Sequence, residues 1–259
     1  MRLGCFGFSG DLDSIVQAGF DFAELDIMEL SRMTEYQFHE FVRRAKDSGL
    51  GFDAFSGFMP LSERIHSPEF DAQKWLEHAR RMVDRASRLG IRLLPLGAGK
   101  CRSIPAGADP GECRERVRSF FGGIARIVAL YGVKVCIEPL GPANSNFLNT
   151  IGETAQFARE IGEENCLTMC DMRHMVKLNE PWEDIVTWRD AIVHAHIDFP
   201  LGDARRFPAP EDGYNYLPYL QALRRAEYAG PLTVEATAYS DLAKEGAACV
   251  QMLQKMLKR

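Results

Sequence analysis

Four residues with carboxylate or imidazole side chains stand at the ends of four successive apolar runs in the second half of the chain. They are Glu138 in VKVCIEPL, Asp171 in LTMCDMRHM, His196 in IVHAHIDF and Glu235 in LTVEAT. Carboxylates that crowd together raise one another's pKa, and a divalent cation removes that cost. Three carboxylates and one imidazole form an oxygen-rich ligand set. The pattern therefore predicts a site for Mn²⁺, with Mg²⁺, Co²⁺ or Zn²⁺ as alternatives.

The run IVHAHIDF contains three polar residues at two-residue spacing, namely His194, His196 and Asp198. On an extended strand this spacing directs all three side chains to the same side. His196 is nearer the carboxyl end than His194, so we expect it to be the metal ligand. We expect His194 one layer deeper, as a hydrogen-bonded core histidine or as a support for a ligand. Asp198 either stands behind the ligands or faces solvent.

These residues need elements to position them, and the chain alternates short apolar runs with longer amphipathic stretches. Eight runs predict strands over 3–8, 20–26, 50–57, 91–96, 133–140, 166–171, 191–199 and 232–237. The stretches that follow them predict helices over 11–19, 34–46, 71–89, 110–131, 153–161, 182–189, 214–228 and 241–258.

Eight strands and eight helices in strict alternation predict parallel pairing and closure into a (β/α)8 TIM barrel. The alternative is an open doubly wound sheet, but the first strand is followed by FGFSGDLDS rather than a GxGxxG turn. No linker or break in composition is visible, so we expect one domain over 1–259. Active sites of such barrels lie at the carboxyl ends of the strands, where the four residues stand.

The composition and charge of the chain exclude several classes of protein. The chain has 259 residues, 46% hydrophobic and 26% charged, which is typical of one barrel and excludes a disordered chain. The net charge of −5 argues against a nucleic-acid partner. No run approaches the roughly 18 apolar residues of a membrane span, and the amino terminus does not resemble a signal peptide. The seven cysteines are scattered without CxxC spacing, so we expect reduced thiols and a cytoplasmic protein.

The chain resembles the sugar-phosphate isomerase/epimerase superfamily, the xylose isomerase-like barrels. The motifs that carry the resemblance are IEPL…SNFLNT, CDMRHM, HAHID and RRFPAPEDGYNY…LRRAEYAGPLTVEA, and it covers essentially the whole chain. It implies that the four residues above are metal ligands. It also implies that His174 binds substrate, together with Arg206 or, in an alternative register, Arg205. Relatives are often homodimers or homotetramers.

The resemblance implies a metal-dependent isomerase or epimerase acting on a sugar, a sugar phosphate or a polyol ketone. Glu138 and Glu235 would form an acid/base pair that moves a proton next to a carbonyl through an enediolate. One departure concerns Asn144, in IEPLGPANSNFLNT, which stands where ketose epimerases carry a glutamate that helps to hold the sugar. This departure counts against a free-ketose 3-epimerase and leaves the metal site unaffected.

Three other functions compete with this interpretation. A dehydratase of a keto-polyol, of the inosose or dehydroshikimate type, could use the same metal and glutamates. A barrel could also keep the metal site and only bind a sugar or a partner protein. A nuclease of the endonuclease IV type needs extra histidines near strands three and four, and only His66 comes close.

Several further residues have two interpretations. Lys100 and Arg102, in GAGKCRS, could bind an anion or belong to a plain connecting loop. Glu24, near the end of the second strand, could contact the site or pair with a neighbour. The aromatic residues Phe6, Phe8, Phe58 and Trp182 could border a sugar pocket or pack in the core.

Overall fold

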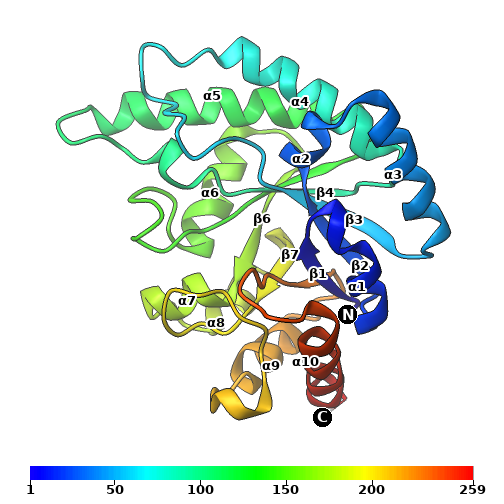
Figure 1. The fold of residues 1–259 in the computed structure, drawn as a ribbon. Helices are drawn as coiled ribbons and strands as arrows, with labels where there is room; N and C mark the ends of the chain where they lie inside the picture. Colours follow the sequence, from blue (N-terminus) through cyan, green and yellow to red (C-terminus); the bar gives the residue numbers. More distant parts are fainter. Residues whose placement is uncertain (259) are drawn as a thin grey trace.

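The computed structural model describes residues 1–258, and its eight parallel strands close into one barrel in chain order (Figure 1). The strands are β1 (Leu3–Gly7), β2 (Phe22–Asp26), β3 (Gly51–Ser56), β4 (Leu93–Leu96), β5 (Lys134–Ile137), β6 (Cys166–Asp171), β7 (Ile192–Ile197) and β8 (Leu232–Val234). Because β8 pairs with β1, the sheet has no free edge. The predicted (β/α)8 barrel is confirmed.

Helices surround this barrel. They are α1 (Leu12–Ala18), α2 (Ile27–Arg32), α3 (Glu35–Asp47), α4 (Ala72–Ser87), α5 (Pro110–Ala129), α6 (Ile151–Ile161), α7 (Met172–Leu178), α8 (Glu183–Thr187), α9 (Leu217–Arg225) and α10 (Leu242–Leu257). The first and last of these, α1 and α10, lie side by side (Figure 1). No helix within residues 1–258 is long and apolar enough to cross a membrane.

The predicted strict alternation of eight strands and eight helices is wrong in two places. Helix α2 directly follows β2, and α7 directly follows β6, each ahead of a second helix. Both begin at an aspartate cap: Asp26 accepts a hydrogen bond from Glu29 N–H, and Asp171 accepts one from His174 N–H. Such caps stabilise a short first turn. Helices of six and seven residues are too short for apolar periodicity to reveal them.

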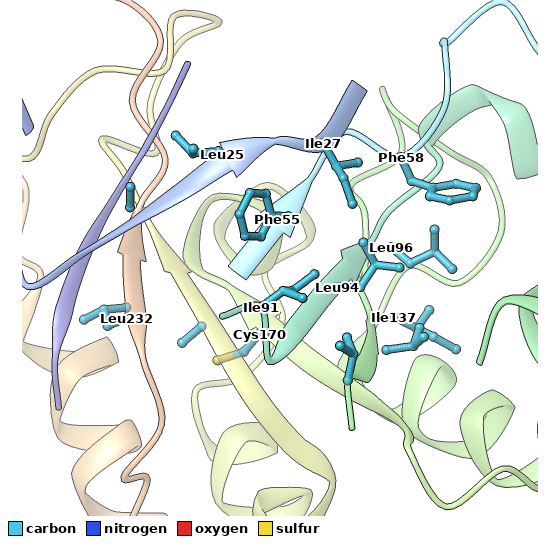
Figure 2. Packing of buried hydrophobic residues seen from close by; sticks show 14 of the residues in the cluster. Leu25, Ile27, Phe55, Phe58, Ile91, Leu94, Leu96, Ile137, Cys170 and Leu232 are labelled. Carbon is cyan, nitrogen blue, oxygen red and sulfur yellow. The ribbon is translucent and has the colours of Figure 1, made fainter. Parts of the chain in front are cut away.

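Alternating strand residues divide the core into two parts. Side chains such as Leu25, Phe55 and Leu94 pack in the main core cluster, together with residues of the surrounding helices (Figure 2). Residues of opposite parity form a separate small cluster, made by Ala54, Leu93, Cys136 and Met169. The two-residue period of a strand accounts for this division, since neighbouring side chains leave on opposite faces. The polar residues of the site share the parity of the small inner cluster.

Most of the predicted strands are longer than the observed ones, and for two of them the difference affects predicted site residues. Strand β5 ends at Ile137 and β8 ends at Val234, whereas runs 133–140 and 232–237 were expected to be extended throughout. Glu138 and Glu235 are therefore the first residues after their strands. At that position a side chain keeps the orientation of the strand while its backbone already belongs to the loop above the barrel.

Candidate active site

The four predicted ligands come together at the carboxyl ends of β5 to β8. One donor atom of each of Glu138, Asp171, His196 and Glu235 lies within 4.8 Å of the others. His196 Nδ1 is 3.0 Å from Glu235 Oε2, 3.6 Å from Asp171 Oδ2 and 3.8 Å from Glu138 Oε1. Asp171 and His196 are paired in register on β6 and β7, so the sheet itself sets them side by side.

The cluster fits a divalent cation. Among the described residues, two of its buried atoms have no hydrogen-bond partner: Asp171 Oδ2 and His196 Nδ1. Buried polar atoms normally have a partner, so these two atoms are the ones that a cation would bind. The other polar atom of each side chain is engaged, by His174 N–H and by Glu24 respectively. Three carboxylates and one imidazole around these two atoms form an oxygen-rich donor set that suits a divalent cation.

Crowding of carboxylates has the expected electrostatic effect. Burial and the neighbouring Glu235 carboxylate raise the pKa of Glu138 to about 8. Arg205 offsets part of the negative charge, because it donates a hydrogen bond to Glu235 and its Nη1 lies 3.6 Å from Asp171 Oδ2. A bound cation would add positive charge and favour the ionised form of all three carboxylates.

The expectation that Arg206 reaches the site is wrong, and the alternative register is the observed one. Arg206 is exposed, and its guanidinium stacks over the Phe199 ring, 4.2 Å from the centroid. Arg205 instead lies against Glu235, with Nη2 3.3 Å from His174 Nε2. Neighbouring residues of an extended segment point to opposite sides, so a shift of one residue decides which arginine reaches the cluster.

His174 lies beside the ligands, with Nε2 3.8 Å from Glu138 Oε1. Gly141 N–H donates a 3.0 Å hydrogen bond to Nδ1 of this ring. Burial lowers the pKa of His174 and favours the neutral ring. Since Nδ1 is the acceptor, the neutral ring carries its proton on Nε2. His174 therefore presents an N–H donor toward the cluster.

A cavity of about 220 Å³ adjoins the cluster. The polar residues that line it include Glu138, Asn144, His174, His196, Arg205 and Glu235, and the larger apolar ones are Phe6, Phe58, Met59, Leu61 and Leu140. Gly97 makes room for the side chain of Glu138, because a Cβ there would lie 2.4 Å from Glu138 Oε2. A larger cavity, of about 880 Å³, opens at the amino-terminal end of the barrel near Arg2 and Lys134, away from every predicted site residue.

Asp198 is buried and does not face solvent. Its Oδ2 accepts a 2.6 Å hydrogen bond from Arg173 Nε, and Arg205 Nη1 lies 3.6 Å away. Arg173 also donates to the backbone oxygens of Phe199, Gly202 and Ala204, which belong to the loop that carries Arg205. Sequence reasoning missed Arg173, although it lies within the motif CDMRHM, between Asp171 and His174.

The contacts of Arg102 decide between its two interpretations. Arg102 is completely buried, and it donates to the backbone oxygens of Glu138, Phe147 and Leu148 rather than to an anion. Lys100 is exposed and lines a neighbouring cavity of about 680 Å³.

Glu24 contacts the site from behind. Its Oε2 lies 2.8 Å from His194 Nε2, and both of its oxygens lie 3.2 Å from His196 Nε2. Burial opposes ionisation, but His196 and His194 hold the pKa of Glu24 well below its usual value. His194 is thus hydrogen-bonded one layer beneath His196, and the sequence offered no signal for this pairing beyond the position of Glu24 near a strand end.

Comparison with known proteins agrees with this architecture. The family described as xylose isomerase-like TIM barrel matches residues 12–256. D-psicose 3-epimerase of Agrobacterium fabrum (strain C58) is 24% identical over 237 residues, which cover 88% of this chain and 78% of that protein.

Solved structures show the same fold. A D-psicose 3-epimerase crystallised in the presence of D-fructose superimposes with a TM-score of 0.85 at 18% identity, over 100% of both chains. An L-ribulose 3-epimerase gives a TM-score of 0.82 at 18% identity, over 99% of this chain and 94% of that one. With the family matched over nearly its whole length, this chain belongs to the xylose isomerase-like TIM barrels.

Proposed function

We propose that this protein is a divalent-metal-dependent sugar isomerase or epimerase that moves a proton next to a carbonyl. The proposal rests on the unequal exposure of the three carboxylates in the cluster. The side chains of Glu138 and Glu235 are 12% and 19% exposed and border the cavity, whereas that of Asp171 is 1% exposed. The two glutamates can therefore reach a substrate, while Asp171 can serve only as a ligand.

Each residue has a defined task in this reaction. A bound ion would polarise the carbonyl of an α-hydroxy ketone and acidify the neighbouring C–H. One of Glu138 and Glu235 accepts that proton, and the other returns a proton. Return to the opposite face of the same carbon gives epimerisation, and return to the adjacent carbon gives isomerisation. Acid–base help of this kind contributes roughly 10²- to 10⁴-fold in rate.

Two further side chains hold the substrate in this proposal. The Nε2–H of His174 and the guanidinium of Arg205 donate hydrogen bonds to substrate oxygens, where negative charge develops as the proton leaves. Both residues line the cavity. Donors already aimed at that charge stabilise the transition state without reorganisation.

The relatives, the donor set and the cysteines support the proposed substrate class, metal ion and compartment. The similar proteins include D-psicose and L-ribulose 3-epimerases, which supports a small ketose or related sugar as substrate. Three carboxylates with one imidazole support Mn²⁺ as the ion, and Mg²⁺, Co²⁺ and Zn²⁺ are the alternatives. The seven cysteines are free and buried, in keeping with the reducing cytoplasm that we propose as its compartment.

A keto-polyol dehydratase is the second candidate, and Asn144 is the observation that favours it. This residue borders the cavity at the place where the ketose epimerases that the chain resembles carry a glutamate. A dehydratase would use the same base to remove the proton, and the protonated partner glutamate would give its proton to the departing hydroxide, which leaves as water.

Solvent-deuterium exchange tests these assignments. The Mn²⁺-loaded protein is incubated in D₂O with ketoses, keto-inositols or dehydroshikimate. A chelator then removes the metal from the mixture, and the substrate is examined by NMR. We expect exchange at a carbon next to the carbonyl, with Glu138→Gln and Glu235→Gln each at least about 10²-fold slower. Glu180→Gln replaces a buried carboxylate that belongs neither to the cluster nor to the lining of its cavity; it is the matched control and should exchange normally.

The outcomes separate the candidate functions. Undiminished exchange in both glutamate variants contradicts the two-base proposal. Loss of water from a keto-polyol identifies the dehydratase. Mn²⁺ binding without exchange or dehydration on the whole panel indicates a barrel that only binds its ligand.

A further inference from the structure

Glu24 makes a contact that crosses the interior of the barrel. It lies on β2, and its two imidazole partners lie on β7, although these strands are not neighbours in the sheet. The carboxylate is 0% exposed and sits between His194 Nε2 and His196 Nε2, at 2.8 Å and 3.2 Å. The two imidazole rings are nearly perpendicular, with centroids 4.8 Å apart. Both rings thus converge on one carboxylate from different directions.

The chemistry of a carboxylate fixes what each imidazole must offer. An ionised carboxylate only accepts hydrogen bonds, so an imidazole that bonds to it must carry a proton on the facing nitrogen. For His196 the facing nitrogen is Nε2. In a neutral ring the lone pair is then on Nδ1, the atom that faces Glu235, Asp171 and Glu138.

Stability alone does not account for this arrangement. Burying charged groups costs free energy, and well-packed apolar residues often replace them at no loss of stability. The inner cluster next to it, with Ala54, Leu93, Cys136 and Met169, shows that apolar side chains fit at this parity. A carboxylate at position 24 therefore serves the two histidines rather than the packing of the barrel.

We propose that Glu24 is a positioning residue of the metal site, which holds the His196 ring so that its Nδ1 lone pair faces the metal. His194 shares the same carboxylate and fixes its orientation. Hydrogen-bond acceptors behind a metal-bound histidine typically raise metal affinity by about 10- to 100-fold. This inference rests on the metal site of the proposed function, and it does not depend on which reaction the site performs.

Metal affinity is the first test. Chelator-stripped protein is titrated with Mn²⁺ in a calorimeter, comparing the wild type, Glu24→Gln and Glu180→Gln. Glutamine preserves the shape of the side chain, but it is uncharged and one half of its end group donates. His196 Nε2, which lies 3.2 Å from both oxygens of Glu24, would therefore face an N–H group in place of one acceptor. We expect the Mn²⁺ dissociation constant of Glu24→Gln to rise by about 10- to 100-fold, and that of Glu180→Gln to equal the wild-type value.

The outcomes of this titration are distinct. Equal Mn²⁺ affinity in Glu24→Gln and the wild type overturns the positioning role and leaves the metal site intact. A wild-type protein that binds no Mn²⁺ overturns the metal site and this role together. The titration measures binding and not turnover, so failure of the proposed sugar reaction would appear only in the exchange assay.

A second measurement needs no variant. Wild-type protein with ¹⁵N-labelled histidine is loaded with Zn²⁺, which is diamagnetic, and long-range ¹H–¹⁵N spectra identify the protonated ring nitrogens. We expect Nε2 protonated in both His194 and His196, with Nδ1 of His196 bound to the metal. A proton on Nδ1 of His196, or a metal bound through its Nε2, overturns the proposal even if Glu24→Gln does not fold.

Discussion

The Arg205 guanidinium donates a hydrogen bond to the Glu235 carboxylate, one of the two glutamates that border the cavity. It also lies 3.3 Å from His174 Nε2, which lines the same cavity. The adjacent Arg206 turns outward and stacks on Phe199. Two successive arginines thus differ in one respect that matters for chemistry, namely which side of the loop they occupy.

This difference gives the first prediction. Arg205→Ala should lower kcat/KM for exchange by about 10²- to 10³-fold, because it removes a donor aimed at developing charge. Arg206→Ala should change it by about 2-fold or less, as is usual for a surface substitution. Initial exchange rates at saturating Mn²⁺ measure both. Similar losses in the two variants would contradict the assignment of Arg205 to the site.

Removal of the metal should lower thermal stability. At free Mn²⁺ about 100 times its dissociation constant, binding to the folded state adds about 2.7 kcal/mol. For a chain of this size that corresponds to roughly 5 to 10 °C in Tm, measured by calorimetry with Mn²⁺ and with EDTA. Asp171→Asn replaces an anionic ligand and should abolish most of the shift. A shift of full size in that variant would place the stabilising ion elsewhere.

Glu180 gives a prediction about pH. Burial raises the pKa of this carboxyl from 4.5 to about 7 in the folded protein. Between these two values the folded state holds a proton that the unfolded chain has released, so stability from this group falls as pH rises through the window. Above pH 7 the loss reaches about 3 kcal/mol.

Glutamine at position 180 should remove this pH dependence. Its oxygen can still accept the hydrogen bond that Ile151 N–H donates at 2.7 Å, and it has no proton to lose. Urea denaturation should show Glu180→Gln more stable than the wild type by about 3 kcal/mol at about pH 8, with little difference at about pH 4. A larger gain in stability at the lower pH would contradict a raised pKa of Glu180 in the folded protein.

The buried pair of Arg173 and Asp198 gives a prediction about stability. Arg173→Ala should lower the free energy of unfolding by about 3 to 5 kcal/mol, because it leaves a buried carboxylate without its partner. Arg189→Ala removes an exposed arginine 3.8 Å from Asp190 and should cost less than about 1 kcal/mol. Urea denaturation compares the two. Equal losses would show that the buried pair contributes no more than the exposed one.

The sequence predicted the barrel because its signal is repeated eight times. It also predicted that Glu138, Asp171, His196 and Glu235 would cluster, since parallel strands bring their carboxyl ends to one rim and these residues stand at or directly after the ends of apolar runs. The short helices α2 and α7 were not predicted, because each contains fewer than two full turns beyond its aspartate cap.

Other features depend on relations that spacing does not encode. To choose between Arg205 and Arg206, one must know the path of their loop to within one residue. The role of Arg102 depends on backbone oxygens from another loop, which have no sequence signature. Pairing of Glu24 with His194 and His196 joins residues 170 and 172 positions apart across the barrel interior.

That crossing contact has a consequence for the chain as a whole. The four predicted ligands lie at the carboxyl ends of β5 to β8, in the carboxyl-terminal half of the barrel, whereas Glu24 comes from β2. A fragment that begins after β4 would contain all four ligands and would still leave Nε2 of His196 without this acceptor. Given the proposed role of Glu24, tight metal binding reports closure of the entire barrel, and refolding followed through Mn²⁺ affinity would time the docking of its two halves.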